Sequence, residues 1–79
     1  MSRAERKTHI LKFFADRGFQ VNENVDLFES GAIDSMGVIE LAVFIEEEFE
    51  VYLDAEKMLA ENFRTVTAIC NLINSLDES

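Results

Sequence analysis

The residues best placed to carry chemistry are Asp34 and Ser35, which stand where a loop gives way to an apolar and acidic segment. Aspartate is favoured just before a helix, so Asp34 predicts a helix that begins at Ser35. The first backbone N–H groups of a helix have no partner within it, and they lie at the positive end of its dipole. A phosphate esterified to the Ser35 hydroxyl would be stabilised there. The alternative interpretation is an Asp-Ser pair that only caps the helix.

Other site chemistries find little support in the sequence. Residues 26–37 have glycine at the sixth position of a calcium loop, but Phe28 stands at the third and another glycine replaces the acidic twelfth. His9 is the only imidazole that could serve Ser35 as a base, and it falls on a helix predicted to be exposed. Cys70 falls on an apolar helix face, where an inert buried thiol is expected. We therefore expect no catalytic residue and no metal site.

The residues that follow the loop read Asp-Ser-Met-Gly-Val-Ile-Glu-Leu from Asp34, and residues 45–51 read Ile-Glu-Glu-Glu-Phe-Glu-Val. This pattern resembles the acyl and peptidyl carrier protein family, over roughly residues 5–76. The resemblance implies that Ser35, flanked by Asp34 and Met36, carries a covalent 4′-phosphopantetheine derived from coenzyme A. It also implies a non-catalytic carrier that holds an acyl or aminoacyl group as a thioester on this arm and delivers it to partner enzymes.

Details outside this motif are more similar to stand-alone aminoacyl or D-alanyl carriers than to fatty-acid carriers. They are Leu-Phe-Glu at residues 27–29, Ile33 before the Asp-Ser pair, and Glu-Asn-Phe-Arg-Thr-Val at residues 61–66. The resemblance implies a phosphopantetheinyl transferase, an acyl or amino acid ligase or synthetase, and downstream acyl-transfer enzymes as partners. The alternative from another class is an acidic helical protein–protein interaction module that uses the same surface without modification.

Charge is distributed unevenly over the 79 residues, whose net charge is −9. Residues 1–17 carry +3, so residues 18–79 carry −12. Between Asp34 and Glu56 there are eight acidic residues and no basic one. This distribution argues against nucleic acid as a partner and favours enzymes with basic docking surfaces.

Apolar residues recur at helical rather than alternating spacing, which predicts an all-α four-helix bundle with three longer helices and one short helix. The first helix begins at Ser2, with Glu5 at capping-box spacing, and ends near Gly18. A long loop over residues 19–33 follows, anchored to the core by its apolar residues. The second helix is expected over about residues 35–50.

The second helix has two stripes of different character. Its inward stripe is expected to be core and consists of Val38, Leu41, Ile45 and Phe49. A second stripe begins beside Ser35, mixes apolar with acidic side chains, and consists of Met36, Glu40, Val43 and Glu47. We interpret this second stripe as the docking face for partner enzymes. The alternative is that Met36 and Val43 are core residues or isolated exposed apolar residues.

The last part of the chain predicts two further helices. Asp54 caps a short third helix over residues 55–60, and Thr65 caps the last helix. Phe63 packs the connection between them onto the core. The last helix keeps apolar register through Val66, Ile69, Cys70, Ile73 and Leu76.

The length predicts a single domain over residues 1–79. The longest apolar run, residues 41–45, is far too short to cross a bilayer, and the charged start lacks the apolar region of a signal peptide. One cysteine forms no internal disulfide, which is consistent with a reducing compartment. We therefore expect a cytoplasmic protein without membrane insertion, and a monomer because its like charges repel.

Overall fold

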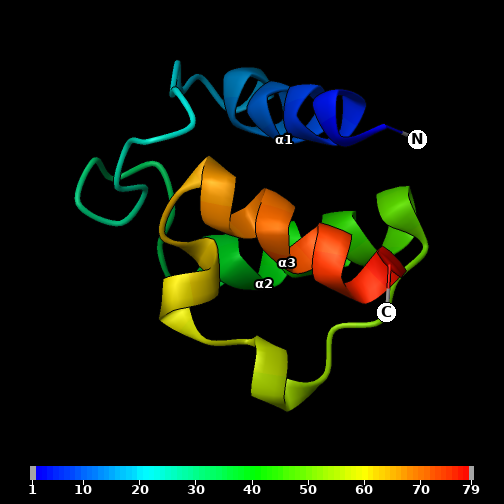
Figure 1. Cartoon of the computed structure of the whole chain (residues 1–79). Helices are drawn as coiled ribbons and strands as arrows, with labels where there is room; N and C mark the ends of the chain where they lie inside the picture. Colours follow the sequence, from blue (N-terminus) through cyan, green and yellow to red (C-terminus); the bar gives the residue numbers. More distant parts are fainter. Residues whose placement is uncertain (1, 79) are drawn as a thin grey trace.

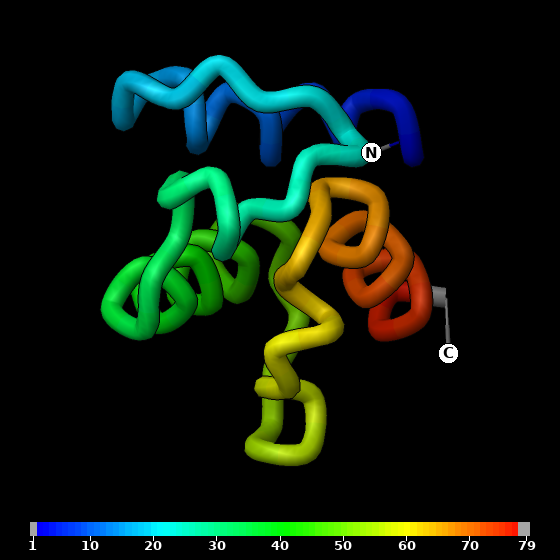
Figure 2. Tube along the Cα trace, turned by 90° about the vertical axis from the view of Figure 1, so that its left-hand side faces the viewer, coloured from blue at the N-terminus to red at the C-terminus, as the bar shows by residue number. Residues whose placement is uncertain are grey.

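The computed structural model describes residues 2–78, and their side chains over residues 2–77. This part of the chain is all helical, with three α-helices and two short 3-10 helices: α1 (Arg3–Asp16), α2 (Ser35–Phe49), η1 (Ala55–Lys57), η2 (Ala60–Phe63) and α3 (Val66–Glu78). In Figure 1, α1 lies on one side of the molecule, η1 and η2 lie on the opposite side, and α2 and α3 lie between them. Figure 2 shows the same order after a turn of 90°. The predicted all-α class is confirmed.

The short third helix that was expected over residues 55–60 is instead two separate 3-10 helices. Asp54 caps the first one as predicted, because its Oδ1 accepts a hydrogen bond from the Lys57 N–H at 3.2 Å. The backbone is then extended at Leu59, and η2 begins after it. The Lys57 carbonyl accepts from the Asn62 side-chain amide at 2.9 Å. The Lys57 carbonyl therefore has a hydrogen-bond partner without a continuous α-helix. The two segments have three and four residues, a length at which the 3-10 form is common.

Both ends of α1 follow the predicted capping chemistry. The Ser2 hydroxyl accepts from the Glu5 N–H at 3.1 Å, and the Glu5 carboxylate accepts from the Ser2 N–H at 3.3 Å. Hydrogen bonds to Ser2 lower the pKa of the Glu5 carboxyl. At the other end Gly18 has φ of 89°, and the Phe19 N–H donates to the Phe14 carbonyl at 2.9 Å. Glycine adopts this left-handed conformation without strain, so the helix ends where the sequence predicts.

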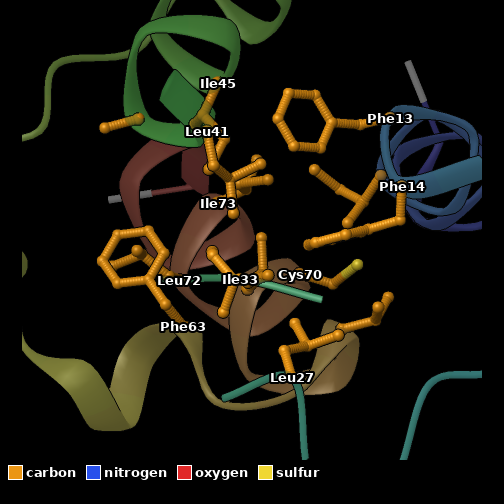
Figure 3. Close-up of a cluster of buried hydrophobic side chains, with 14 of the residues drawn as sticks. Phe13, Phe14, Leu27, Ile33, Leu41, Ile45, Phe63, Cys70, Leu72 and Ile73 are labelled. Atoms are coloured by element: carbon orange, nitrogen blue, oxygen red, sulfur yellow. The ribbon is translucent and has the colours of Figure 1, made fainter. Parts of the chain in front are cut away.

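The core is formed by one face of each α-helix together with residues of the connecting segments. Figure 3 shows side chains from these elements converging, among them Phe13, Phe14, Leu41, Ile45, Phe63, Cys70 and Ile73. Leu41 and Ile45 of the predicted inward stripe are fully buried, while Val38 and Phe49 are partly buried at its edge. Phe63 is also fully buried, as its predicted packing role requires. None of the helices in the described part of the chain is long and apolar enough to cross a membrane.

The loop between α1 and α2 is fixed to the rest of the molecule at several points. Leu27 is fully buried and its N–H donates to the Arg64 carbonyl at 2.7 Å. The Ile33 N–H donates to the Leu27 carbonyl at 3.0 Å. The Glu23 carbonyl accepts from both the N–H and the hydroxyl of Thr67, at 3.1 and 2.9 Å. These contacts give a long loop a defined path to the start of α2.

A buried arginine joins α1 to α3. Arg6 is only 7% exposed although it lies on a strongly charged helix. Its guanidinium donates to the side-chain oxygen of Asn74, which is itself buried, and pairs with the half-exposed carboxylate of Asp77. No local pattern of the sequence predicts this contact. The pairing compensates the desolvation of the guanidinium and holds the two helices together.

Replacement of Arg6 by alanine should therefore destabilise the fold markedly. Arg6→Ala leaves the buried Asn74 side chain without its donor and opens a gap between α1 and α3, so we expect the free energy of unfolding to fall by about 2–3 kcal/mol. Urea denaturation followed by circular dichroism measures this loss. Lys12→Ala, which removes an exposed pair with Asp16, should cost less than about 0.5 kcal/mol. Equal effects of the two variants would contradict this assignment.

Candidate functional site

Ser35 is the first residue of α2, and its side chain is exposed. Asp34 precedes it with an extended backbone, and its Oδ1 accepts a hydrogen bond from the Gly37 N–H at 2.8 Å. Ile33, one residue earlier, is only 4% exposed. The chain therefore leaves the core at Ile33 and presents the Ser35 hydroxyl at the surface, where a modifying enzyme has access to it.

The first turn of α2 offers backbone donors beside this hydroxyl. Gly37 and Val38 donate their N–H groups to the side chain and the carbonyl of Asp34, respectively. The N–H groups of Ser35 and Met36 have no acceptor within the helix, because they precede its first complete turn. Together with the helix dipole, these donors favour a negative group bound to the Ser35 oxygen. The site thus has the chemistry that a phosphodiester needs.

Gly37 allows the capping residue Asp34 and the buried Ile33 to pack closely against the first turn of α2. A Cβ atom at this position would lie 3.0 Å from the Ile33 Cγ1 and 3.3 Å from the Asp34 Oδ1. Ile33 is buried and has little room to shift. The absence of a side chain at Gly37 therefore lets Ile33 and Asp34 pack over the first turn of α2. Their packing fixes the position of Ser35 at the start of the helix.

The apolar members of the predicted docking stripe lie at the surface of α2. Met36 is 65% exposed and Val43 is 49% exposed, so neither is a core residue. Ile39, which the sequence interpretation left out, is 57% exposed. It is three residues after Met36 and four before Val43, so helical spacing alone was sufficient to include it. These three side chains form an apolar surface strip that begins beside Ser35.

The acidic members of the stripe, Glu40 and Glu47, are also exposed, but their surroundings differ. The Glu40 carboxylate pairs with the guanidinium of Arg17, the residue just after α1, at 2.6 Å. Arg17 also lies 3.9 Å from the centre of the Phe13 ring. The Glu47 side chain makes no hydrogen bond or ion pair with the described residues, so its carboxylate is available to a partner.

Asp26 organises the turn that leads toward Ser35. Its Oδ1 accepts the N–H groups of Phe28 and Glu29, both at 3.0 Å, and its Oδ2 pairs with Arg64 at 3.1 Å. The hydrogen bond from Glu29, followed by those from Arg64 and Phe28, lowers the pKa of the Asp26 carboxyl below its ordinary value. This carboxylate is therefore a structural acceptor. Among the described residues, no three histidine, cysteine, aspartate or glutamate side chains gather as a metal site.

His9 and Cys70 lie apart from Ser35. The His9 ring is 2.7 Å from a Glu48 carboxylate oxygen and packs near Phe49, so it is a paired, half-buried residue and not the solvated one that the sequence suggested. Glu48 lies 13 residues beyond Ser35 on α2, about 20 Å along the helix axis. His9 is therefore not a base for Ser35. Cys70 is 9% exposed, and burial raises the pKa of its thiol, which keeps it neutral.

Comparison with known proteins agrees with this geometry. A family model described as a phosphopantetheine attachment site matches residues 13–73, which include the start of α2. The chain belongs to this family of phosphopantetheine carrier proteins. It is 33% identical over 54 residues to the D-alanyl carrier protein of Streptococcus uberis and 32% identical over 54 residues to that of Streptococcus pyogenes serotype M5. Each match covers 68% of both chains.

Membership confirms the resemblance found in the sequence. As a carrier protein, the chain is non-catalytic and carries 4′-phosphopantetheine covalently. The described residues fit this group, because an exposed hydroxyl stands beside free backbone donors at the start of a long helix. The chemistry of the carrier protein thus resides in the cofactor, and the protein provides position and recognition.

The Asp34 cap of α2 should contribute measurably to the free energy of unfolding of the carrier protein. Asp34→Ala removes the acceptor for the Gly37 N–H, so the free energy of unfolding should fall by about 1 kcal/mol. Asp34→Asn retains a capping oxygen and should stay within about 0.5 kcal/mol of the wild type. Urea denaturation of the three proteins checks both values. The interpretation fails if alanine and asparagine have the same effect.

The lowered pKa of Asp26 predicts a pH dependence of stability. The contribution of a carboxyl whose pKa is lowered on folding is fully present above its unfolded pKa, about 3.9 for aspartate, and is lost as pH falls through the lower folded value. Asp26→Asn should therefore show a shallower loss of the free energy of unfolding below about pH 4 than the wild type. Arg64→Ala retains both backbone hydrogen bonds and should give an intermediate slope. Urea titrations at a series of pH values compare the slopes, and a wild-type slope for Asp26→Asn would contradict the assignment.

Proposed function

We propose that Ser35 is the attachment residue, and that this carrier protein holds an aminoacyl group as a thioester on the arm and delivers it to partner enzymes. The observation that carries the proposal is the exposed Ser35 hydroxyl at the capped start of α2, inside the segment that matches the phosphopantetheine family. The two D-alanyl carrier relatives support an amino acid as cargo, with D-alanine as the first candidate.

The residues around Ser35 have separate tasks in this proposal. In the modification, the Ser35 oxygen would attack the pantetheine-side phosphorus of coenzyme A and form the phosphodiester as the pyrophosphate bond breaks. Adenosine 3′,5′-bisphosphate would leave, and the hydroxyl proton would pass to a base of the transferase. Asp34 holds the helix start through the Gly37 N–H, and the free N–H groups of Ser35 and Met36 favour the negative charge of the diester. When bound, the cofactor supplies a flexible arm with a terminal thiol.

The exposed stripe on α2 is the proposed docking face for partner enzymes. Met36, Val43 and the newly recognised Ile39 offer apolar contacts, and Glu40 and Glu47 offer carboxylates. Partners with basic surfaces would bind it rapidly and in a salt-sensitive manner. The proposed partners are a phosphopantetheinyl transferase, an amino acid ligase or synthetase, and downstream acyl-transfer enzymes. We propose the cytoplasm as the compartment, which the single buried cysteine supports.

Mass spectrometry tests the attachment residue directly. Incubation of the wild type with coenzyme A, magnesium and a permissive transferase should add the mass of one phosphopantetheine, and Ser35→Ala should add none. Ser30→Ala removes the other serine hydroxyl near the start of α2, which donates to the Leu27 carbonyl at 3.3 Å, and this variant should be modified fully. Circular dichroism should show the same helical content in all three proteins. A wild type that stays unmodified would contradict the proposal and favour the unmodified interaction module.

A further inference from the structure

A groove with a volume of about 640 Å³ lies between α1 and α2. Its floor is apolar, since Phe13 of α1 and Phe44 of α2 line it with ring centres 5.0 Å apart, and Val43 lies beside them. Its rim is charged, with carboxylates and basic groups from both helices. The surface between α1 and α2 therefore combines apolar side chains with charged ones.

The groove is continuous with the surface around Ser35. A second hollow of about 280 Å³ is lined by the neighbours of Ser35, namely Asp34, Met36 and Gly37. The two hollows share three lining residues, which are Phe13, Arg17 and Glu40. The Arg17–Glu40 ion pair thus stands where they meet. Both side chains of this pair are about half exposed, and exposed pairs are weak, so the pair can open to admit a ligand.

The dimensions of the groove match the reach of an arm attached to Ser35. Glu47, which lines the groove, lies 12 residues after Ser35 on the same helix, or about 18 Å along its axis. Phosphopantetheine has roughly 14 bonds between the serine oxygen and its sulfur, and an extended chain gains about 1.2 Å per bond, which gives about 17 Å. A fully extended arm therefore brings the sulfur to about the level of Glu47 along the helix axis, and the carried group together with the Glu47 side chain spans the remaining gap.

The charges of the groove favour a cationic cargo. Three of its four carboxylates already have a basic partner within the groove, in these pairs: Asp16 with Lys12 (3.1 Å), Glu40 with Arg17 (2.6 Å) and Glu48 with His9 (2.7 Å). Glu47 is the fourth, and it has no partner among the described residues. An aminoacyl thioester ends in an ammonium group, which complements this carboxylate, whereas a fatty acyl chain has no charge to offer.

We propose that the groove between α1 and α2 receives the loaded end of the Ser35 arm, and that Glu47 pairs there with the ammonium of an α-aminoacyl cargo. This inference rests on the proposed function, because it requires an arm on Ser35. The apolar floor of Phe13 and Phe44 contacts the methyl and methylene groups of the arm. Since an exposed ion pair is weak, the cargo is held loosely and leaves the groove when a partner enzyme binds.

Nuclear magnetic resonance of the loaded protein tests this inference. Ser35 is first modified with coenzyme A analogues in which a stable amide replaces the thioester, so that the arm ends in either D-alanyl or propionyl. These two groups differ only by the ammonium. The D-alanyl arm should give nuclear Overhauser contacts to Phe13, Val43 and Phe44, and the same contacts should be about two- to five-fold weaker for the propionyl arm.

Variants identify the role of the carboxylate. Glu47→Gln should weaken the contacts of the D-alanyl arm to the propionyl level and leave those of the propionyl arm unchanged. Glu61→Gln, which removes an exposed carboxylate outside the groove, should leave both arms unchanged. A modified wild type without contacts to the groove, or a Glu47→Gln variant that keeps them, would overturn the inference and leave the proposed function intact. If mass spectrometry finds no arm on Ser35, the proposed function fails, and this inference fails with it.

Discussion

The hydrogen bond between the Asp34 carboxylate and the Gly37 N–H is the constraint on which the site depends. It fixes where α2 begins, and the burial of Ile33 fixes where the chain leaves the core. Between these two anchors Ser35 has a single position, exposed and beside free backbone donors. With the proposed attachment at Ser35, partner enzymes would meet the arm at one fixed place on the surface.

The C-terminal end of α2 is less favourable than its capped start, because several features there destabilise the helix. Four glutamates lie at or just after its last turn, where the negative end of the helix dipole disfavours them. Glu50 also adopts the left-handed conformation with φ of 54°, which is unfavourable for a residue with a Cβ. Two contacts offset part of this cost: Glu48 pairs with His9, and Glu46 accepts the Leu53 N–H at 2.8 Å. The end of α2 that carries Glu47 of the proposed docking face is therefore less well stabilised than the capped end that carries Ser35.

The sequence predicted the features that depend on neighbouring residues. The capping box of Ser2, the caps at Asp34 and Asp54, and the end of α1 at Gly18 follow from side chains a few positions apart. Contacts between distant segments were not predictable, since no spacing rule connects Arg6 with Asn74 or Arg17 with Glu40. Whether the segment after Asp54 would be α-helical or 3-10 helical was also not predictable, because so short a segment has little intrinsic preference between the two geometries.

The burial of Cys70 has a consequence for the chemistry of the carried group. A thioester is readily attacked by a thiolate, and a second reactive sulfur on the same molecule would compete for the acyl group by transthioesterification. Cys70 is packed in the core on α3, and burial raises the pKa of its thiol. The single cysteine of the chain is therefore a poor nucleophile, and under the proposed function it would not compete with partner enzymes for the carried group.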